Sequence, residues 1–284
     1  MDTRFLQSLL AVVDTGSIAA AARLQGLTAA AVSQRIRVLE AELDCELLNR
    51  SAHAAVPTEA CLRLLSPARK LVRDAARLSA EADPDGLRGP FRLGAVSTAL
   101  HESVPALIRT FREKAPNAEL TIRPGTSLSL YEGLLAGDLN AAITVEPPFA
   151  LPKGIVSELL VTQAIVHISP GDLSRQDTRE NALPWIVYDR TSWGGRLIWE
   201  ACHARIAGGH ILCELDALET IALLVAQGVG QAIVPHWRGL TESRLRIGPS
   251  GAAGTLSRKL VFLRKNAPAS VLGDLALAAL RQEA

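Results

Sequence analysis

Residues Thr28–Leu43 read TAAAVSQRIRVLEAEL, a stretch without glycine or proline that predicts a helix. Its apolar side chains recur every three or four residues and predict one apolar stripe, formed by Val32, Ile36, Leu39 and Leu43. The other side is small and polar and carries Ala30, Ser33, Gln34 and Arg37. Such a face can enter a major groove, because small residues permit close approach and Ser, Gln and Arg can bond to base edges or phosphates. This stretch alone leaves an ordinary surface helix as the alternative.

The residues before this stretch predict two further helices joined by a glycine turn. A first apolar helix ends at Gly16, and Ser17 can N-cap a short second helix, Ile18–Leu24, whose inner side is almost all alanine. Gly26 suits the left-handed position that closes the second helix, and Thr28 can cap the next. Helix, short turn and helix together form the helix-turn-helix arrangement, and the capped N-terminus of its last helix suits a phosphate.

Two short strands are predicted after the helix-turn-helix. Residues 46–50 (ELLNR) and 54–57 (AAVP) flank a turn at residues 51–53 and predict a wing beside the recognition helix. Arg50 or His53 could touch a phosphate there, although a solvated loop histidine is the favoured explanation of His53. The wing would extend the DNA-binding surface of the predicted helix.

A heptad spacing predicts a long helix from Thr58 to about Asp83. Its seam consists of Leu64, Ala68, Leu71, Ala75, Leu78 and Ala82. The pattern favours dimerisation through Leu64, Leu71 and Leu78, and the alternative is a helix that lies on its own domain. Pro67 falls inside the run and is expected to kink or soften its first turns. Turn-forming residues then mark a linker at 82–90.

The rest of the chain alternates strands with helices, which is typical of an α/β protein with parallel, doubly wound sheets. Strands are predicted at 91–96, 119–123, 141–145, 164–168, 185–188, 211–214, 231–234 and 259–264. Helices are predicted at 103–114, 128–136, 191–206, 217–226 and 271–282. Two such lobes, with the chain crossing between them more than once, would enclose a cleft.

Length and composition agree with a protein of this kind. A chain of 284 residues with 48% hydrophobic residues predicts about two domains with real cores. No apolar run approaches the roughly 20 residues of a membrane span, and the start, MDTRF, has no signal-peptide pattern. We therefore expect a soluble, cytoplasmic protein without a membrane partner. The cysteines, at 45, 61, 202 and 213, form no CxxC pair and are expected to be reduced thiols.

Charge argues against unspecific polyanion binding. The whole chain has a net charge of +1, and residues 1–60 hold five arginines against seven acidic residues, a net of −2. The arginines at 23, 35 and 37 nevertheless cluster near the start of the predicted recognition helix, whereas the acidic residues at 40, 42, 44 and 46 lie at its end. Local charge decides phosphate contact, so DNA binding remains the favoured interpretation.

Over its full length the sequence resembles the LysR family of transcriptional regulators. The strongest part is FLQSLLAVVDTGSIAAAARLQGLTAAAVSQRIRVLEAEL at Phe5–Leu43, followed by LLNR at Leu47–Arg50 and PTEA at Pro57–Ala60. Weaker segments follow in the family's order at Phe91–Gly125, Leu134–Val145 and Val225–Trp237. The chain departs from the family pattern at Ala29 and Ala30 in the recognition helix and at Asp44, Cys61 and Asn140.

The resemblance implies an α/β fold in three parts. Residues 1–60 form an all-α winged helix-turn-helix DNA-binding domain, and residues 61–88 form a long linker helix for dimerisation. Residues 89–284 form a two-lobed α/β effector-binding domain like the type II periplasmic binding proteins. Its first lobe comprises residues 89–162 and 265–284, and its second lobe comprises residues 163–264.

The resemblance also implies the partners. They are double-stranded promoter DNA, a second copy or a tetramer of this chain, RNA polymerase and a small-molecule effector, with no cofactor and no metal. The candidate DNA-binding residues are Ser17, Thr28, Ala29, Ala30, Ser33, Gln34, Arg35, Arg37, Arg50 and His53.

The effector site is expected beyond the carboxyl ends of the strands, where loops lead into helices. Hydroxyls, backbone N–H groups and Arg190 would suit a small carboxylate there, and Trp193 could supply an apolar wall. The candidates are Ser97, Thr98, Thr126, Ser127, Glu146, Arg190, Thr191, Trp193 and Gly230.

Three other classes of protein remain as alternatives. A solute-binding protein or transport receptor of the same two-lobed fold leaves residues 5–43 unexplained and lacks an export signal. An enzyme would need a catalytic constellation, and the spacing of the residues suggests none. A thiol redox switch through Cys202 and Cys213 is less favoured than their packing as small core residues.

Overall fold

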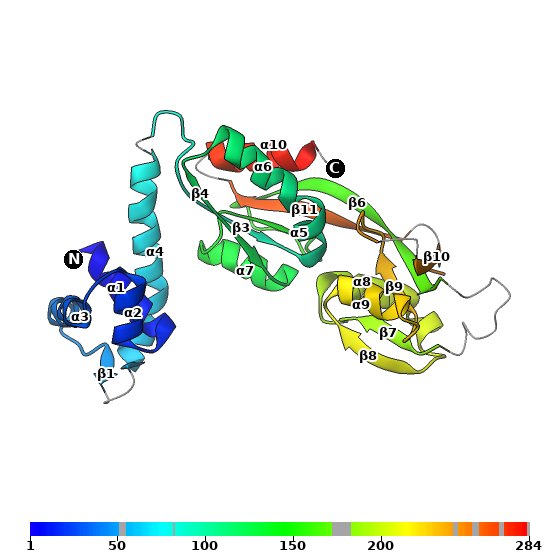
Figure 1. Cartoon of the computed structure of the whole chain (residues 1–284), viewed down its shortest axis with the longest axis horizontal. Coiled ribbons are helices and arrows are strands. Elements are labelled where there is room, and N and C mark those ends of the chain that lie inside the picture. Colours follow the sequence, from blue (N-terminus) through cyan, green and yellow to red (C-terminus); the bar gives the residue numbers. More distant parts are fainter. Residues whose placement is uncertain are drawn as a thin grey trace. The chain divides into compact units, whose positions relative to one another are not determined.

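The computed structural model describes residues 1–50, 55–81, 83–171, 183–240, 244–251, 256–266 and 270–282. The chain divides into two compact units, Met1–Pro84 and Asp85–Ala284 (Figure 1). The first unit has one hydrophobic core, and the second has two main cores, one in each of its lobes.

The N-terminal unit consists of four helices and a two-stranded wing. The helices are α1 (Thr3–Thr15), α2 (Ile18–Leu24), α3 (Ala29–Leu43) and α4 (Glu59–Glu81). The wing strands are β1 (Leu48–Arg50) and β2 (Ala55–Pro57), which pair antiparallel. This order confirms the winged helix-turn-helix that the sequence predicts.

The predicted N-caps Ser17 and Thr28 define the starts of α2 and α3. The side chain of Ser17 accepts a hydrogen bond from Ala20 N at 3.4 Å and caps α2. The side chain of Thr28 accepts one from Ala31 N at 3.2 Å and caps α3. Each cap pairs a backbone donor that the first helical turn leaves unsatisfied.

The turn between α2 and α3 is a Schellman motif. Gly26 has a left-handed φ of 64°, and its N–H donates to Arg23 O at 3.3 Å. The N–H of Leu27 donates to Ala22 O at 2.9 Å. These two bonds satisfy the last carbonyls of α2 and direct the chain into α3, as the glycine at this position predicts.

The buried part of the apolar stripe of α3 ends at Leu39. Val32, Ile36 and Leu39 are fully buried in the core of the N-terminal unit, where α3 packs on α1 and α2, but Leu43 is 36% exposed. Leu43 continues the apolar stripe in sequence but lies outside the buried core. The helix ends at this residue, and Asp44 turns the chain away with a left-handed φ of 50°.

Helix α4 divides the predicted heptad seam. Leu64 and Ala68 pack against the core of their own unit, whereas Leu71 is 46% exposed and Leu78 is 69% exposed. The helix continues through Pro67 from Glu59 to Glu81, so the proline does not end it. Only the later part of the seam therefore remains open to a partner.

No single helix among the described residues is long and apolar enough to cross a membrane. Helices α1 and α2 meet the length and composition together, but they are bent by 119° at their junction. Both contribute buried side chains to the core of the N-terminal unit.

The second unit is a mixed α/β structure. Its strands are β3 (Gly89–Ala95), β4 (Ala118–Pro124), β5 (Ala141–Val145), β6 (Ile155–Pro170), β7 (Trp185–Tyr188), β8 (Ile211–Leu215), β9 (Ala232–Pro235), β10 (Leu245–Pro249) and β11 (Ser257–Lys265). Its helices are α5 (Ser97–Glu102), α6 (Val104–Lys114), α7 (Ser127–Ala136), α8 (Trp193–Ile206), α9 (Leu218–Ala226) and α10 (Val271–Arg281).

Two long strands connect the lobes. The main sheet has the order β10-β6-β11-β5-β3-β4, with β9 also paired to β6. The first part of β6 pairs with β11, and its last part pairs with β9 and β10. Strands β6 and β11 therefore run from one lobe to the other in opposite directions (Figure 1).

The predicted parallel sheet is only partly correct. Strand β3 is parallel to β4 and β5, and β7 is parallel to β8. Strand β11 is antiparallel to both β5 and β6, because it returns the chain from the second lobe to the first. The sequence interpretation also missed β10, α5 and the first part of β6.

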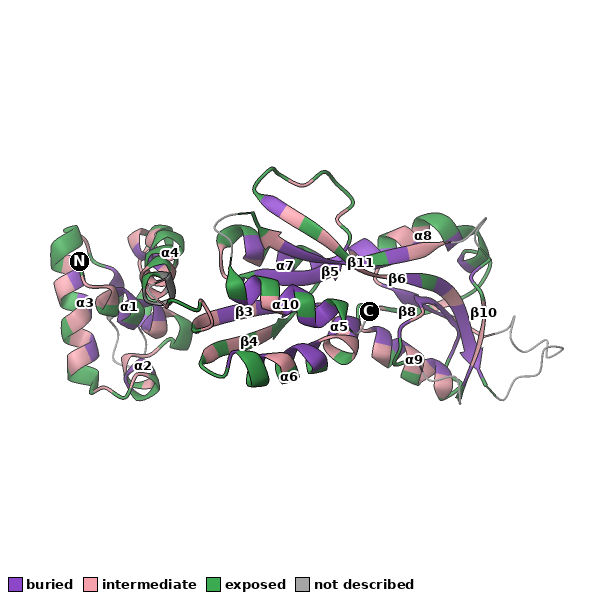
Figure 2. Cartoon of the chain, turned by 90° about the horizontal axis from the view of Figure 1, so that it is seen from above, coloured by how far each residue is buried: buried purple, intermediate pink, exposed green. Residues whose placement is uncertain are grey.

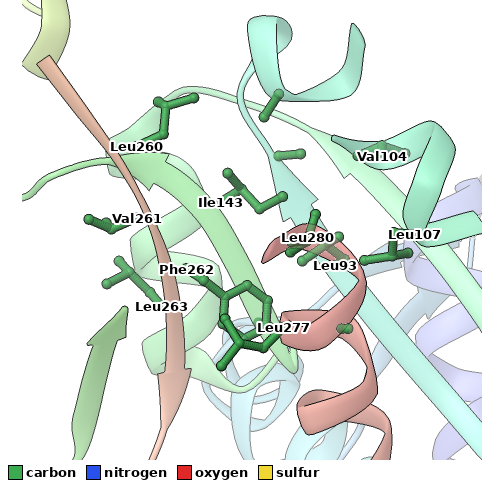
Figure 3. Packing of buried hydrophobic residues seen from close by; sticks show 14 of the residues in the cluster. Leu93, Val104, Leu107, Ile143, Leu260, Val261, Phe262, Leu263, Leu277 and Leu280 are labelled. Carbon is green, nitrogen blue, oxygen red and sulfur yellow. The ribbon is translucent and has the colours of Figure 1, made fainter. Parts of the chain in front are cut away.

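The first lobe packs helices on a buried sheet. All of β5 is buried, and Figure 2 shows that buried residues gather on the central strands. Phe262 and Ile143 of the sheet lie close to Leu277 and Leu280 of α10 (Figure 3). This core fixes the part of β11 that lies in the first lobe.

The left-handed backbone conformation of Asp44 should carry strain that a substitution can remove. It is the non-glycine residue with positive φ among those described, at 50°. We expect Asp44→Gly to raise the free energy of unfolding of the N-terminal unit by about 1 kcal/mol, because glycine adopts this conformation without steric cost. Asp44→Ala serves as the control and should give no gain. Equal changes in Tm for both variants would contradict this explanation.

Candidate functional site

Helix α3 presents the predicted small polar face. Ala29, Ala30, Gln34 and Arg37 are exposed, and Ser33 is half-buried. Arg37 forms no hydrogen bond or ion pair with a described residue. Ala29 and Ala30 at the start of α3 leave room for close approach to a groove. The amide of Gln34 and the guanidinium of Arg37 lie further along the same face. This surface has the shape and chemistry of a groove-reading helix.

Arg35 lies on the inner side of α3 instead of on this face. Its Nη1 donates to Ser8 Oγ of α1 at 3.2 Å, and Ser8 donates to Gln25 Oε1 at 2.9 Å. Ser8 is fully buried. These contacts tie α3 to α1 and to the end of α2. The structure thus gives Arg35 an orienting contact, although the sequence interpretation grouped it with the DNA-contacting residues.

Glu40 fixes the wing to the recognition helix. Its Oε1 accepts hydrogen bonds from Leu47 N at 2.9 Å and from Leu48 N at 3.3 Å. The N–H of Ala55 in β2 donates to Gly16 O at 3.2 Å. The predicted contacts of His53 and of the Arg50 side chain lie outside the described residues. The sequence interpretation missed Glu40, and only its place one turn before the wing could have indicated it.

In the second unit, a buried arginine joins the two lobes. Arg258 of β11 is 1% exposed; its Nε donates to Gln163 Oε1 at 2.8 Å and its Nη2 to Thr98 Oγ1 at 2.9 Å. Burial lowers the pKa of Arg258 from its ordinary value. Both hydrogen-bond partners are neutral, so a positive charge is held at the junction without an ion pair to a described carboxylate.

Further polar side chains surround Arg258. Gln163 donates from Nε2 to Glu102 at 2.9 Å, and Glu102 also accepts the backbone N–H of Arg238 in the second lobe. Burial raises the pKa of Tyr188, whose hydroxyl lies near Arg258 and Asp216. Partial desolvation raises the pKa of Asp216, although its side chain keeps contact with solvent. The junction is therefore a hydrogen-bonded polar network between two apolar cores.

The hydroxyl candidates of the first lobe have different surroundings. Thr98 is 1% exposed and belongs to the Arg258 network. Ser127 is 6% exposed, and its Oγ accepts from Val145 N at 3.1 Å. Thr126 caps α7 by accepting from Ser129 N at 3.2 Å. Ser97 is half-buried at the start of α5 and forms no hydrogen bond to a described residue.

Two charged candidates are already paired. Arg190 binds Glu214 through its Nε and Nη2, the latter at 2.9 Å, and this bond raises the pKa of Arg190 and lowers that of Glu214. Glu146 pairs with Lys259 at 3.1 Å. A carboxylate effector at Arg190 would therefore have to compete with Glu214 for the guanidinium.

Thr191 and Gly230 also have local structural contacts. Thr191 Oγ1 donates to Asp189 at 2.8 Å. A Cβ at Gly230 would come within 2.6 Å of Pro184 O, so glycine is required by the close approach of two backbones. This close approach explains the glycine at position 230 without a ligand.

Trp193 joins the lobes through aromatic contacts. It begins α8, yet its ring lies 6.0 Å from that of Tyr131 and 5.5 Å from that of Phe149, both in the first lobe. It is 9% exposed and belongs to the core of the first lobe. The junction therefore has an apolar side formed by these three rings.

The sequence pattern around Arg258 indicates that this arginine is buried. Arg258, Leu260 and Phe262 alternate along a strand, so they share one face of it. An arginine in line with two core residues is expected to be buried and paired. Its partner Gln163 carried no comparable signal, because the strand containing it was not predicted to begin before residue 164.

Among the described residues, the cysteines are free thiols and the possible metal ligands form no cluster. Burial raises the pKa of the Cys202 thiol, which favours the unreactive protonated form. Within the described ranges, no group of three or more His, Cys, Asp or Glu side chains could hold a metal ion.

Two family models cover most of the chain. The model of the bacterial regulatory helix-turn-helix protein, lysR family, matches residues 3–62. The model of the LysR substrate binding domain matches residues 84–283. The second model begins at residue 84, where the chain divides into its two compact units.

Two curated regulatory proteins are similar to this chain over most of its length. The nitrogen assimilation regulatory protein nac of Klebsiella aerogenes is 29% identical over 244 residues, covering 83% of this chain and 79% of that protein. The HTH-type transcriptional regulator IlvR of Caulobacter vibrioides is 27% identical over 293 residues, covering 98% of this chain and 97% of that protein.

Solved structures of full-length regulators share the fold. A full-length OxyR from Pseudomonas aeruginosa has a TM-score of 0.69 at 20% identity, covering 100% of this chain and 99% of that one. A full-length CbnR complexed with its target DNA has a TM-score of 0.68 at 21% identity, covering 100% of both chains.

The contact between Glu40 and the wing can be tested by mutation. Glu40→Ala leaves the buried N–H groups of Leu47 and Leu48 without this acceptor and should cost about 1–3 kcal/mol of unfolding free energy. Glu42→Ala, on the same helix, should cost little, because Glu42 makes only an exposed pair with the N-terminus. Denaturant unfolding of both variants decides the matter, and equal midpoints would refute the role of Glu40.

Proposed function

The chain belongs to the LysR family of transcriptional regulators, and we propose that it binds promoter DNA through α3 as a homodimer or homotetramer. The exposed face of Ala29, Ala30, Gln34 and Arg37 on a helix with a capped N-terminus is the observation that carries the proposal. Two copies of this face, one from each protomer, would read two half-sites of a promoter.

Base reading would be shared unequally along the helix. The amide of Gln34 and the guanidinium of Arg37 suit base edges or phosphates, and the alanine methyls suit the methyl group of thymine. Thr28 and the first N–H groups of α3 suit a phosphate. Few polar readers therefore remain, so half-site spacing and DNA shape would contribute much of the specificity.

Dimerisation would use the exposed part of α4. Leu71 and Leu78 lie one heptad apart and are both largely exposed. Burying a leucine against a partner contributes about 1.5–3 kcal/mol. Leu64 already packs in its own unit, so it would add little to the interface.

The small-molecule effector would bind at the junction of the two lobes. The half-buried hydroxyl of Ser97 lies next in sequence to Thr98, which accepts from the buried Arg258. Trp193, Tyr131 and Phe149 provide an apolar side to the same junction. A buried positive charge beside hydroxyls favours a small carboxylate as the effector.

Binding and not catalysis would be the whole activity. Both family models describe parts of a regulator, which neither the solute-binding nor the enzyme interpretation explains. The buried, protonated thiol of Cys202 also disfavours a redox switch. We propose that the protein acts in the cytoplasm, where promoter DNA lies.

The DNA-binding proposal is tested by gel shift with the intergenic DNA upstream of its own gene. Arg37→Ala should weaken binding about tenfold and reduce the salt slope by about 1, as expected for the loss of one charged contact. Arg112→Ala, at an exposed position of α6 in the other unit, is the matched control and should bind normally. Absence of sequence-preferring binding by the unmodified protein at moderate salt would sink the proposal.

The effector proposal is tested by thermal shift with a panel of small carboxylates. A compound that stabilises the protein through the junction should lose its effect in Ser97→Ala. Ser157→Ala, on an exposed position of β6, should keep the full shift. A shift that survives unchanged in Ser97→Ala would place the ligand elsewhere.

A further inference from the structure

The second lobe contains a cavity that the proposed function does not use. It has a volume of about 510 Å³ and lies between β6, β7, β10 and the end of α8. This volume falls within the usual range for small-molecule sites, about 300–1,000 Å³. None of the nine effector candidates lines it, so it is separate from the junction between the lobes.

The lining of this cavity is positively charged. Arg205 from α8 and Arg246 from β10 both line it, and no Asp or Glu occurs among its described lining residues. The guanidinium of Arg205 donates to Pro249 O at 2.9 Å and forms no ion pair with a described residue. Arg205 therefore brings a charge and further N–H donors to the cavity, which suits an anion.

Buried polar side chains form another part of the lining. His167 and Gln231 are each 4% exposed, and their side chains bond at 2.8 Å. Gln231 also donates from Nε2 to Leu183 O at 2.9 Å, so its Oε1 accepts from His167 Nε2–H. This chain fixes the tautomer of the histidine and the orientation of the amide before any ligand arrives.

An indole ring completes the lining. Trp185 is 5% exposed, and its ring lies 5.5 Å from that of His167 and 5.9 Å from the guanidinium carbon of Arg205. The indole ring would pack against the planar part of a ligand. The guanidinium would pair with the charged group of the same ligand. Gly248 of β10 also lines the cavity, and a Cβ there would meet no atom within 4 Å.

We propose that this cavity binds a small planar organic anion, a carboxylate or a phosphate ester, independently of the junction between the lobes. Arg205 pairs with the anionic group, and Trp185 packs against the planar part. The His167–Gln231 pair supplies fixed polar atoms beside them. The protein therefore has two ligand sites in its C-terminal unit.

Calorimetric titration of the full chain tests this proposal with three probes. Nicotinate carries both a planar ring and a carboxylate, nicotinamide carries the same ring without charge, and inorganic phosphate carries charge alone. We expect nicotinate to bind at least tenfold more tightly than nicotinamide or phosphate. Binding of none of the probes at millimolar concentration, or tightest binding of nicotinamide or phosphate, would overturn the proposal.

Two variants locate the bound probe. Arg205→Gln should raise the Kd for nicotinate about tenfold, in line with the strength of a charge-assisted hydrogen bond. Arg196→Gln, on the same helix but outside the cavity, should leave the Kd unchanged. Gly248→Val should abolish binding by filling the cavity, and Gly154→Val, also placed in open space, is its control.

The same titrations distinguish the two sites. Ser97→Ala should leave nicotinate binding unchanged, because Ser97 does not line the cavity. Nicotinate binding that is lost in Ser97→Ala but survives in Arg205→Gln and Gly248→Val would overturn the proposal and assign the probe to the junction. Thermal unfolding of each variant before titration establishes that the comparison is between folded proteins.

Discussion

The antiparallel pairing of β6 with β11 is the constraint on which the C-terminal unit depends. Residues Ile155–Ala164 pair with Ser257–Lys265, while the end of β6 pairs in the second lobe. Neither strand can shift without breaking ladder hydrogen bonds in both lobes. Arg258 lies at this crossing and bonds to Gln163 and Thr98, so its side chain connects the crossing strands to the first helix of the effector-binding unit.

Much of the fold was predictable, because it depends on local signals. Ser17, Gly26 and Thr28 specify their caps and turn through residue types that few other positions require. The crossing strands were harder. The first part of β6 alternates polar and apolar residues, and its direction relative to β11 is set by the route of the chain between lobes, which no local pattern encodes. For the same reason, the expected parallel sheet extended too far.

The site was less predictable than the fold, because charged side chains choose partners across the structure. Arg190 and Arg35 were both expected to face a ligand or DNA, yet one binds Glu214 and the other binds Ser8. Glu40, noted in the sequence only as one of the acidic residues at the end of the helix, holds the wing. In each case the residue type was informative, but the partner lies on another element and is invisible in sequence. The exposed face of α3 was predicted better, since helical spacing alone defines it.

The bond from Arg35 to Ser8 has a consequence for engineering. Ser8 and Gln25, which continue this hydrogen-bonded chain, lie on α1 and at the end of α2, outside the recognition helix. A recognition helix transplanted whole from a relative would bring its own residue at position 35 and leave two buried or half-buried polar side chains mismatched. Redirecting this protein to another operator is therefore a matter of exchanging single outward positions. The recognition helix has to be kept together with Ser8 and Gln25, which bind its Arg35 through one hydrogen-bonded chain.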